Sequence, residues 1–327
     1  GAPVSTTHSI VGGVVGAGIA AAGTASVNWP TMGAIAASWV ISPALGGLIA
    51  AAFLAAVKFL ILFKDDKVAA ARRWVPVFVA IMAAAFAVYL VMKGLKHIHH
   101  ASVFEILLIG AAVLATTYFA VRPAVARASR NMENRRRAVS DLFTIPLSGA
   151  AALLSFAHGA NDVANAVGPL AAIVAAAESG LTSPEKVALP LWVLGIGAVG
   201  ISVGLALFGP RLIRMVGEKI TKMNEVRAYC VALSAAVTVL VASALGLPVS
   251  STHVAVGAVF GVGFLREFSS NAIIRNPPLK VNVPEATSDQ FNQTAEQAIE
   301  KLKGRDKRRL VRRQHAFGIA AAWIITV

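Results

Sequence analysis

The sequence predicts an all-α, polytopic membrane protein in which two repeats are inverted relative to each other and some helices are broken or re-entrant. Three observations lead to this fold class. The 327 residues are 57% hydrophobic and only 14% charged, and several apolar runs exceed the ~20 residues needed to cross a bilayer. A hydroxyl-rich motif occurs twice, and the net positive charge comes from alternate connections between apolar runs.

Apolar runs follow one another along the chain and are expected to be membrane helices. Segment 31–63 is too long for one straight span, and Ser42-Pro43 with Gly46-Gly47 predicts a break or kink. Segment 142–177 is longer still and is expected to form one helix plus a re-entrant piece. The predicted runs are 3–19, 31–63, 74–92, 103–121, 142–177, 187–208, 228–245, 248–265 and 317–327.

The duplicated motif reads GAPVSTTHSIVGGVVGAG at 1–18 and GLPVSSTHVAVGAVFGVG at 246–263, with 11 of 18 positions identical and no gap. A second match follows, because IAASWVI at 35–41 reappears as IAAAWII at 319–325. An apolar chain with such duplications is expected to contain two structural repeats around one shared site.

The net charge of +14 comes from four connections: 64–73 (+2), 122–141 (+4), 209–227 (+3) and 266–313 (+5). Short basic loops that alternate with nearly neutral ones are the positive-inside pattern, which places these four in the cytoplasm. The basic charge is therefore explained by topology, and nucleic-acid binding is disfavoured. The first hydroxyl motif then precedes an external loop and its copy an internal one, so the two copies are expected to be inverted.

This organisation divides the chain into five parts. Residues 1–121 hold the remainder of the first repeat with its connecting helices, and 142–265 hold the second repeat. The connecting parts are a basic cytoplasmic loop at 122–141, a polar cytoplasmic loop at 266–316 and the start of a truncated helix at 317–327. Inverted repeats are a common architecture of secondary transporters, with substrate held near the midplane.

The run 142–177 contains the most deeply placed acidic residue, Asp162. An intramembrane carboxylate is costly and usually marks an ion or proton pathway. Gly159 and Gly168-Pro169 are expected to let the helix open, which would expose main-chain carbonyls beside Asn161, Asp162 and Asn165. Oxygen ligands of this kind suit a hard cation such as Na⁺. A capping Asn-Asp pair at a loop is the alternative.

Both hydroxyl motifs place Pro and then Ser or Thr ahead of a Gly-rich apolar run, a pattern typical of a helix N-terminus. Two such ends facing each other would form an anion site from dipoles, N–H groups and hydroxyls. Neither motif contains Lys or Arg, so bound cations would balance the anion, and phosphate fits this arrangement. Ordinary capping and small-residue packing is the alternative. The candidate hydroxyls are Ser5, Thr6, Thr7, Ser250, Ser251 and Thr252.

Three histidines are candidates for a supporting role. His8 and His253 occupy equivalent positions in the two motifs, and His158 lies near Asp162 in the sequence. Each is also compatible with a purely structural role. The single cysteine, Cys230, lies in an apolar run and excludes an intramolecular disulfide or a cysteine-based metal site. We expect no cofactor and no metal beyond a coupling cation, Na⁺ or H⁺.

The motif GANDVANAVGP at 159–169 and the paired Pro-Val-Ser-Thr/Ser-Thr-His motifs resemble those of the inorganic phosphate transporter (PiT) family, close to its bacterial members. The resemblance covers most of the chain, with three motifs in the family order. It implies cation-coupled phosphate symport. It also implies that Asn161 and Asp162 bind the coupling ion, and that Asn165 and the six hydroxyl residues listed above bind phosphate.

The family carries a second GAND-type motif ahead of the first hydroxyl motif, and this chain starts after it. We therefore expect a fragment that does not itself transport, from a parent protein that does. The predicted function is cation-coupled symport of inorganic phosphate across the inner cell membrane, with no enzymatic activity. Sulfate or another oxyanion remains an alternative substrate. An anion channel and an intramembrane Ser/His hydrolase are alternatives of other classes. Expected partners are phosphate and the lipid bilayer, with a homodimer left open.

Overall fold

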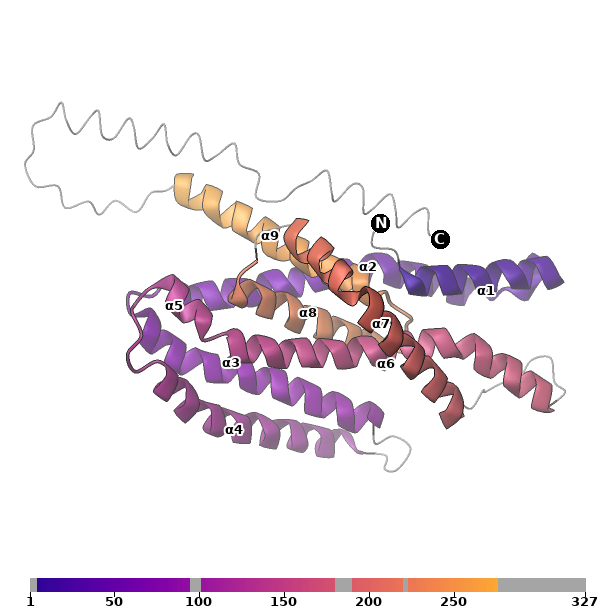
Figure 1. Cartoon of the computed structure of the whole chain (residues 1–327), viewed down its shortest axis with the longest axis horizontal. Coiled ribbons are helices and arrows are strands. Elements are labelled where there is room, and N and C mark those ends of the chain that lie inside the picture. Colours follow the sequence, from indigo (N-terminus) through magenta and orange to yellow (C-terminus); the bar gives the residue numbers. More distant parts are fainter. Residues whose placement is uncertain (1–4, 95–100, 180–189, 220–222, 276–327) are drawn as a thin grey trace, which may run out of the picture.

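The computed structural model describes residues 5–94, 101–179, 190–219 and 223–275, and within these ranges every regular element is helical (Figure 1). The elements are α1 (Thr6–Ala22), η1 (Thr24–Ser26), α2 (Trp29–Val57), η2 (Lys58–Leu62), α3 (Lys67–Tyr89), η3 (Leu90–Gly94), α4 (Val103–Ala128), α5 (Arg136–Asp141), α6 (Thr144–Ser179), α7 (Leu191–Lys219), α8 (Glu225–Ala244) and α9 (Ser251–Arg275).

Six helical stretches in the described part of the chain are long and apolar enough to cross a membrane, so the prediction of a multi-pass membrane protein is confirmed. They are Trp29–Leu62, Lys67–Met92, Val103–Ala128, Arg136–Glu178, Leu191–Gly209 and Glu225–Ala244. The predicted run 317–327 and the second copy of the Ile-Ala-Ala motif lie outside the described residues.

Local sequence signals explain where the helices begin and end. The side chains of Asn28, Asp66 and Asn224 each accept a hydrogen bond from a main-chain N–H in the first turn of α2, α3 and α8. Ser102 and Glu105 form a capping box at the start of α4. Gly23 ends α1 and Gly246 follows α8, both with φ near +75°, a conformation that glycine adopts without steric cost.

Helix α8 is the most deeply buried of the six spans, and α2, α6 and α9 pack around it. The tightest packing is between α2 and α9, where glycines let the two backbones touch. A Cβ atom on Gly261 would collide with the carbonyl of Gly47, and one on Gly257 would collide with the carbonyl of Pro43. Ser234 of α8 donates to the Gly46 carbonyl at 2.5 Å and joins the third helix to this contact. Small residues at such crossings are typical of membrane helices.

No break interrupts α2 or α6, and the alternative of a kink in α2 at Pro43 stays a prediction. Helix α2 continues through Pro43 and passes into the π-turn η2, and α6 continues from Thr144 to Ser179 through Gly159, Gly168 and Pro169. The prediction of a re-entrant piece within 142–177 is therefore wrong. The physical reason is that proline removes one helical hydrogen bond, whereas unwinding a helix in lipid would leave several main-chain groups unsatisfied.

The basic connections meet at one end of the helix bundle, as the charge pattern requires. Hydrogen bonds join the α2–α3 turn to the segment before α5, join α5 to the start of α8, and join η2 to α9. These contacts are Lys67 N–H to Asn134 Oδ1 (2.9 Å), Ser140 Oγ to Glu225 Oε2 (2.6 Å) and Lys58 Nζ to Ser269 Oγ (3.0 Å). Parts of all four basic segments thus lie together, and their cytoplasmic location remains a prediction.

The helices that follow the two hydroxyl motifs run in opposite directions. Figure 1 shows α1 in indigo extending to the right and α9 in yellow-orange extending to the upper left, from starting points near the middle of the molecule. This arrangement agrees with inverted copies of one motif. The relation between two complete repeats, and the five-part division of the chain, stay predictions.

Candidate functional site

The N-termini of α1 and α9 meet beside the middle of α6. The Asn165 side-chain amide donates to Thr7 Oγ1 at 3.1 Å, and Thr7 Oγ1 donates to the Val249 carbonyl at 3.2 Å. The Asn161 amide donates to the same carbonyl at 2.8 Å. Three segments that are far apart in the sequence, 5–8, 161–165 and 249–253, therefore form one polar cluster inside an apolar protein.

Each motif forms its helix start in the same way. The hydroxyl oxygen of Ser5 accepts from the His8 N–H at 3.2 Å, and that of Ser250 accepts from the His253 N–H at 3.3 Å. Both serines are buried and act as N-caps. Helix geometry leaves the first N–H groups of α1 and α9 without intrahelical acceptors, so both ends present donors and a positive dipole end to the shared region.

Asp162 is the acidic residue of this cluster, and its side chain is 13% exposed. His158 Nε2 lies 2.9 Å from Oδ2, and the Asn161 amide donates to Oδ1 at 2.9 Å. Ser251 Oγ, from the first turn of α9, lies 3.4 Å from both carboxylate oxygens. The carboxylate is thus held by two groups of its own helix and faces the second hydroxyl motif.

The six predicted hydroxyl residues fall into two groups. Four of them, Ser5, Thr7, Ser250 and Ser251, are buried within the protein. The hydroxyls of Ser5 and Ser250 cap helices, and the hydroxyl of Thr7 donates to the Val249 carbonyl. Thr6 is exposed and Thr252 is half-buried. The structure therefore places Ser5, Thr7, Ser250 and Ser251 in the polar cluster and leaves Thr6 and Thr252, their neighbours in the chain, as the most accessible hydroxyls. The sequence could not separate the two groups, because all six residues carry the same chemistry.

The three candidate histidines lie in two different settings. His8 and His253 are both buried, and their ring centroids are 4.5 Å apart. His158 is separate from this pair and contacts Asp162. Trp39 of α2 was not singled out as a site residue, yet its ring lies 3.9 Å from that of His8 and its Nε1–H donates to the Pro248 carbonyl at 3.1 Å. The signal that could have found it is its place in the repeated Ile-Ala-Ala motif.

The oxygen atoms of α6 could hold a hard cation. The Asn161 amide nitrogen donates to two acceptors, which directs its carbonyl oxygen elsewhere, and the Asp162 carboxylate lies beside it. Pro169 has no N–H, so the Asn165 carbonyl lacks a helical partner even though the helix is unbroken. This set of oxygens suits Na⁺. Among the described residues no group of three or more His, Cys, Asp or Glu side chains gathers as a metal site.

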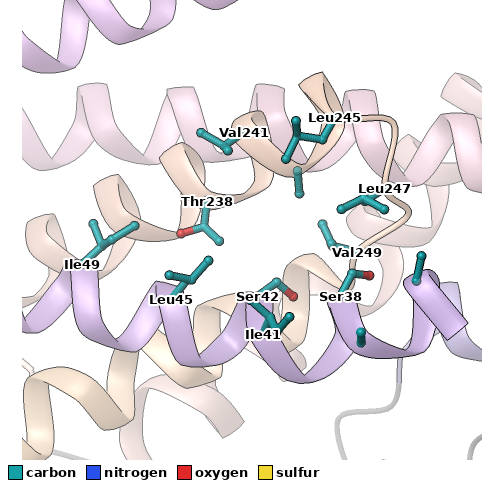
Figure 2. Close-up of a pocket in the computed structure, with 13 residues that line it drawn as sticks. Ser38, Ile41, Ser42, Leu45, Ile49, Thr238, Val241, Leu245, Leu247 and Val249 are labelled. Atoms are coloured by element: carbon teal, nitrogen blue, oxygen red, sulfur yellow. The ribbon is translucent and has the colours of Figure 1, made fainter.

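A cavity of about 260 Å³ lies behind the segment that carries the second motif. Figure 2 shows Ser38, Ser42 and Thr238 with their hydroxyl oxygens among apolar side chains of α2 and α8, and Ser38 lies beside Val249. The cavity is thus almost entirely apolar, and Val249 separates it from the polar cluster. An anion requires donors, so the polar cluster, rather than this cavity, is the candidate site.

The whole chain, residues 1–327, matches the family model described as the phosphate transporter family. A Helicobacter pylori J99 protein named "Putative phosphate permease" is 54% identical over 271 residues, 82% of this chain and 50% of that protein. A Pyrococcus abyssi protein of the same name is 38% identical over 266 residues, 81% of this chain and 65% of that protein. The chain therefore spans half to two thirds of the length of these relatives.

A solved structure named "The sodium-dependent phosphate transporter" matches the fold with a TM-score of 0.75 and 34% sequence identity. The match covers 99% of this chain and 74% of that chain. The similarity therefore extends over nearly all of the sequence and is not limited to the short motifs.

Proposed function

The chain belongs to the phosphate transporter family, and from that premise we propose that its polar cluster binds inorganic phosphate and a coupling cation during symport. The observation that carries the proposal is the convergence of the α1 and α9 N-termini on Asn161, Asp162 and Asn165. Phosphate is the substrate that the names of the relatives and of the structural neighbour support.

The anion is held by neutral donors in this proposal. The donors in this proposal are the first N–H groups of α1 and α9 and the accessible hydroxyls of Thr6 and Thr252. Ser5, Ser250 and Thr7 support these donors by fixing the helix starts and the Val249 carbonyl. Ser251 can exchange its contact with Asp162 for one with the substrate, because its 3.4 Å distances to the carboxylate are long.

The cation balances two negative groups, the bound phosphate and Asp162. In the absence of a basic residue in either hydroxyl motif, transfer of phosphate into the protein interior would be unfavourable without a cation. Asp162 and the carbonyl oxygen of Asn161 supply ligands for Na⁺, and His158 positions the carboxylate. The name of the structural neighbour favours Na⁺ over H⁺. Binding both ions would bias the equilibrium between inward- and outward-facing states.

Two alternatives remain within the transporter class. Sulfate has the same tetrahedral shape, and a proton on Asp162 could replace Na⁺. The other classes have less support, because an anion channel would not need the Asp162 carboxylate beside the anion. A Ser/His hydrolase would need a serine Oγ within reach of a histidine ring, and Ser5 and Ser250 instead cap main-chain N–H groups.

The test is uptake of radiolabelled phosphate into proteoliposomes that contain the native full-length protein. Imposed Na⁺ and H⁺ gradients are compared, with and without excess unlabelled sulfate. We expect Na⁺-dependent uptake that sulfate does not inhibit. Uptake driven by H⁺ alone would assign Asp162 a proton, and inhibition by sulfate would change the assigned substrate. Current without ion coupling would contradict symport.

A further inference from the structure

Lys58 is a half-buried lysine near the end of the span Trp29–Leu62. It opens the π-turn η2, and its Nζ donates to Ser269 Oγ of α9 at 3.0 Å. The charges that act most strongly on its ammonium group are positive, and they belong to Arg266, Arg227 and Arg136. Repulsion between partly buried cations is only weakly screened by solvent and salt, so this arrangement is unfavourable without an anion.

Contacts between four elements explain why these cations meet. Arg266 lies one helical turn before Ser269, the residue of α9 that contacts η2. Arg136 opens α5, and its guanidinium carbon lies 6.0 Å from the ring centroid of Phe63, which directly follows η2. The 2.6 Å hydrogen bond from α5 to the first residue of α8 brings in Arg227, two residues further along that helix. Arg227 also lies within the electrostatic range of Arg266.

Two carboxylates border these cations. Glu225 of α8 acts on Arg227, and Glu267 of α9 directly follows the α9 arginine in the chain. Arg227, Glu267 and that arginine make further contacts of their own. Lys58 and Arg136, by contrast, have no carboxylate partner among the residues that the structure describes; their contacts are the Ser269 hydroxyl and an aromatic ring. An ammonium group carries three N–H donors, so that of Lys58 keeps two for a ligand.

We propose that Lys58, Arg136, Arg227 and Arg266, the basic cluster, bind a phosphate group that belongs to a free phosphate ion or to the headgroup of an anionic phospholipid. Ammonium and guanidinium groups are the usual protein donors to phosphate oxygens, and the anion offsets the repulsion among the four cations. The basic cluster is separate from the polar cluster, because Arg266 lies about 22 Å along α9 from Ser251. It lies at the end of the bundle where the basic connections meet, and its occupancy does not depend on the proposed symport.

The test is the reactivity of the Lys58 amine in the native full-length protein, measured by peptide mass spectrometry after brief acylation with an N-hydroxysuccinimide ester. In lipid-free detergent, inorganic phosphate is compared with chloride at equal ionic strength, which controls for screening. In nanodiscs, phosphatidylcholine alone is compared with a mixture of phosphatidylcholine and phosphatidylglycerol. Lys64, which is exposed on the connection after η2, is the internal control in every sample.

A bound phosphate group should shield the Lys58 amine and leave Lys64 unaffected. We expect ligand well above its Kd to lower the acylation of Lys58 by about fivefold in at least one of the two arms. Protection by inorganic phosphate supports the free ion as the source, and protection by phosphatidylglycerol supports the lipid headgroup. Unchanged reactivity of Lys58 in both arms, or equal protection of Lys64, would overturn the proposal.

Arg136→Gln separates binding at the basic cluster from a conformational change caused elsewhere. Arg136 is exposed, and we expect loss of its charge to raise the ligand concentration that half-protects Lys58 by about two- to fivefold. Arg135→Gln is the matched control, because Arg135 is also exposed but pairs with Glu133 at 3.0 Å. No shift for Arg136→Gln, or the same shift for both variants, would contradict the assignment. These readouts need no phosphate uptake, so failure of the symport proposal would leave them unchanged.

Discussion

The side-chain amide of Asn161 donates a hydrogen bond to the main-chain carbonyl of Val249 at 2.8 Å, although the two residues are 88 positions apart. Asn161 belongs to the middle of α6, and Val249 belongs to the extended segment that leads into α9. The same carbonyl accepts from Thr7 of α1. One main-chain oxygen therefore joins the three segments that make up the candidate site.

This contact predicts that Asn161→Ala destabilises the protein. The Asn161 side chain is buried, and its loss leaves Asp162 and the Val249 carbonyl each without one donor. We expect the free energy of unfolding to fall by about 1–3 kcal/mol. Thermal unfolding of the purified protein in detergent measures this. Asn165→Ala is the control, since Asn165 is less buried, and an equal loss for both variants would contradict the prediction.

Replacing the carboxylate tests the cation role. Asp162→Asn keeps the size and hydrogen-bonding capacity of the side chain but removes its charge. We expect coupled phosphate uptake to fall by about 100-fold, which corresponds to roughly 3 kcal/mol of lost cation binding. Asp141→Asn, at an exposed position of α5, should transport normally. Wild-type uptake by Asp162→Asn, with equal protein in the membrane, would remove Asp162 from the mechanism.

Substitutions of the accessible hydroxyl residues should change the phosphate KM, whereas substitution of a buried one should change the melting temperature. Thr6→Val and Thr252→Val are expected to raise the phosphate KM about three- to tenfold, because each removes one donor to the substrate, and to leave the melting temperature unchanged. Thr7→Val should instead lower the melting temperature, because Thr7 bridges Asn165 and Val249. Uptake kinetics and thermal unfolding of the same three variants test this, and the reverse assignment would refute it.

The close approach of α2 and α9 predicts a strong effect of one methyl group. Gly261→Ala places a Cβ against the Gly47 carbonyl, so the helices must separate, and we expect a loss of stability of about 1–3 kcal/mol. Gly200→Ala in α7 meets nothing within 4 Å and should be neutral or slightly stabilising. Detergent unfolding curves compare the two. Equal stability of both variants would show that α2 and α9 do not pack this closely.

Single cysteines test the predicted orientation. Cys230 is the single cysteine of this sequence and is fully buried, and Cys230→Ala removes its thiol from the background. In that background, Asn131→Cys should be labelled by a membrane-impermeant maleimide only from the cytoplasmic side, because its connection is basic. Ala25→Cys, between α1 and α2, should be labelled only from outside. Labelling of both from one side would contradict the orientation.

Most of the helical framework could be predicted from the sequence. Apolar length predicted the helices α1 to α4 and α6 to α9, and the side chains of Asn28, Asp66 and Asn224 cap three of them. The short helix α5 was missed, because its six residues are too few to show a hydrophobic period. The predicted opening of α6 was wrong, since the sequence marks glycine and proline but does not show that the lipid-facing backbone keeps its remaining hydrogen bonds.

By itself the sequence determined which residue types the candidate site would contain: the Asn-Asp-Asn group of α6 and two hydroxyl-rich helix starts, because composition and repetition are local properties. Only the tertiary structure decided how these groups are used. It buried Thr7 and Ser251 against α6 while leaving Thr6 and Thr252 accessible, and it brought Trp39 between His8 and Pro248. Burial and partnership depend on which helices cross, and the packing of small residues across the whole bundle determines those crossings.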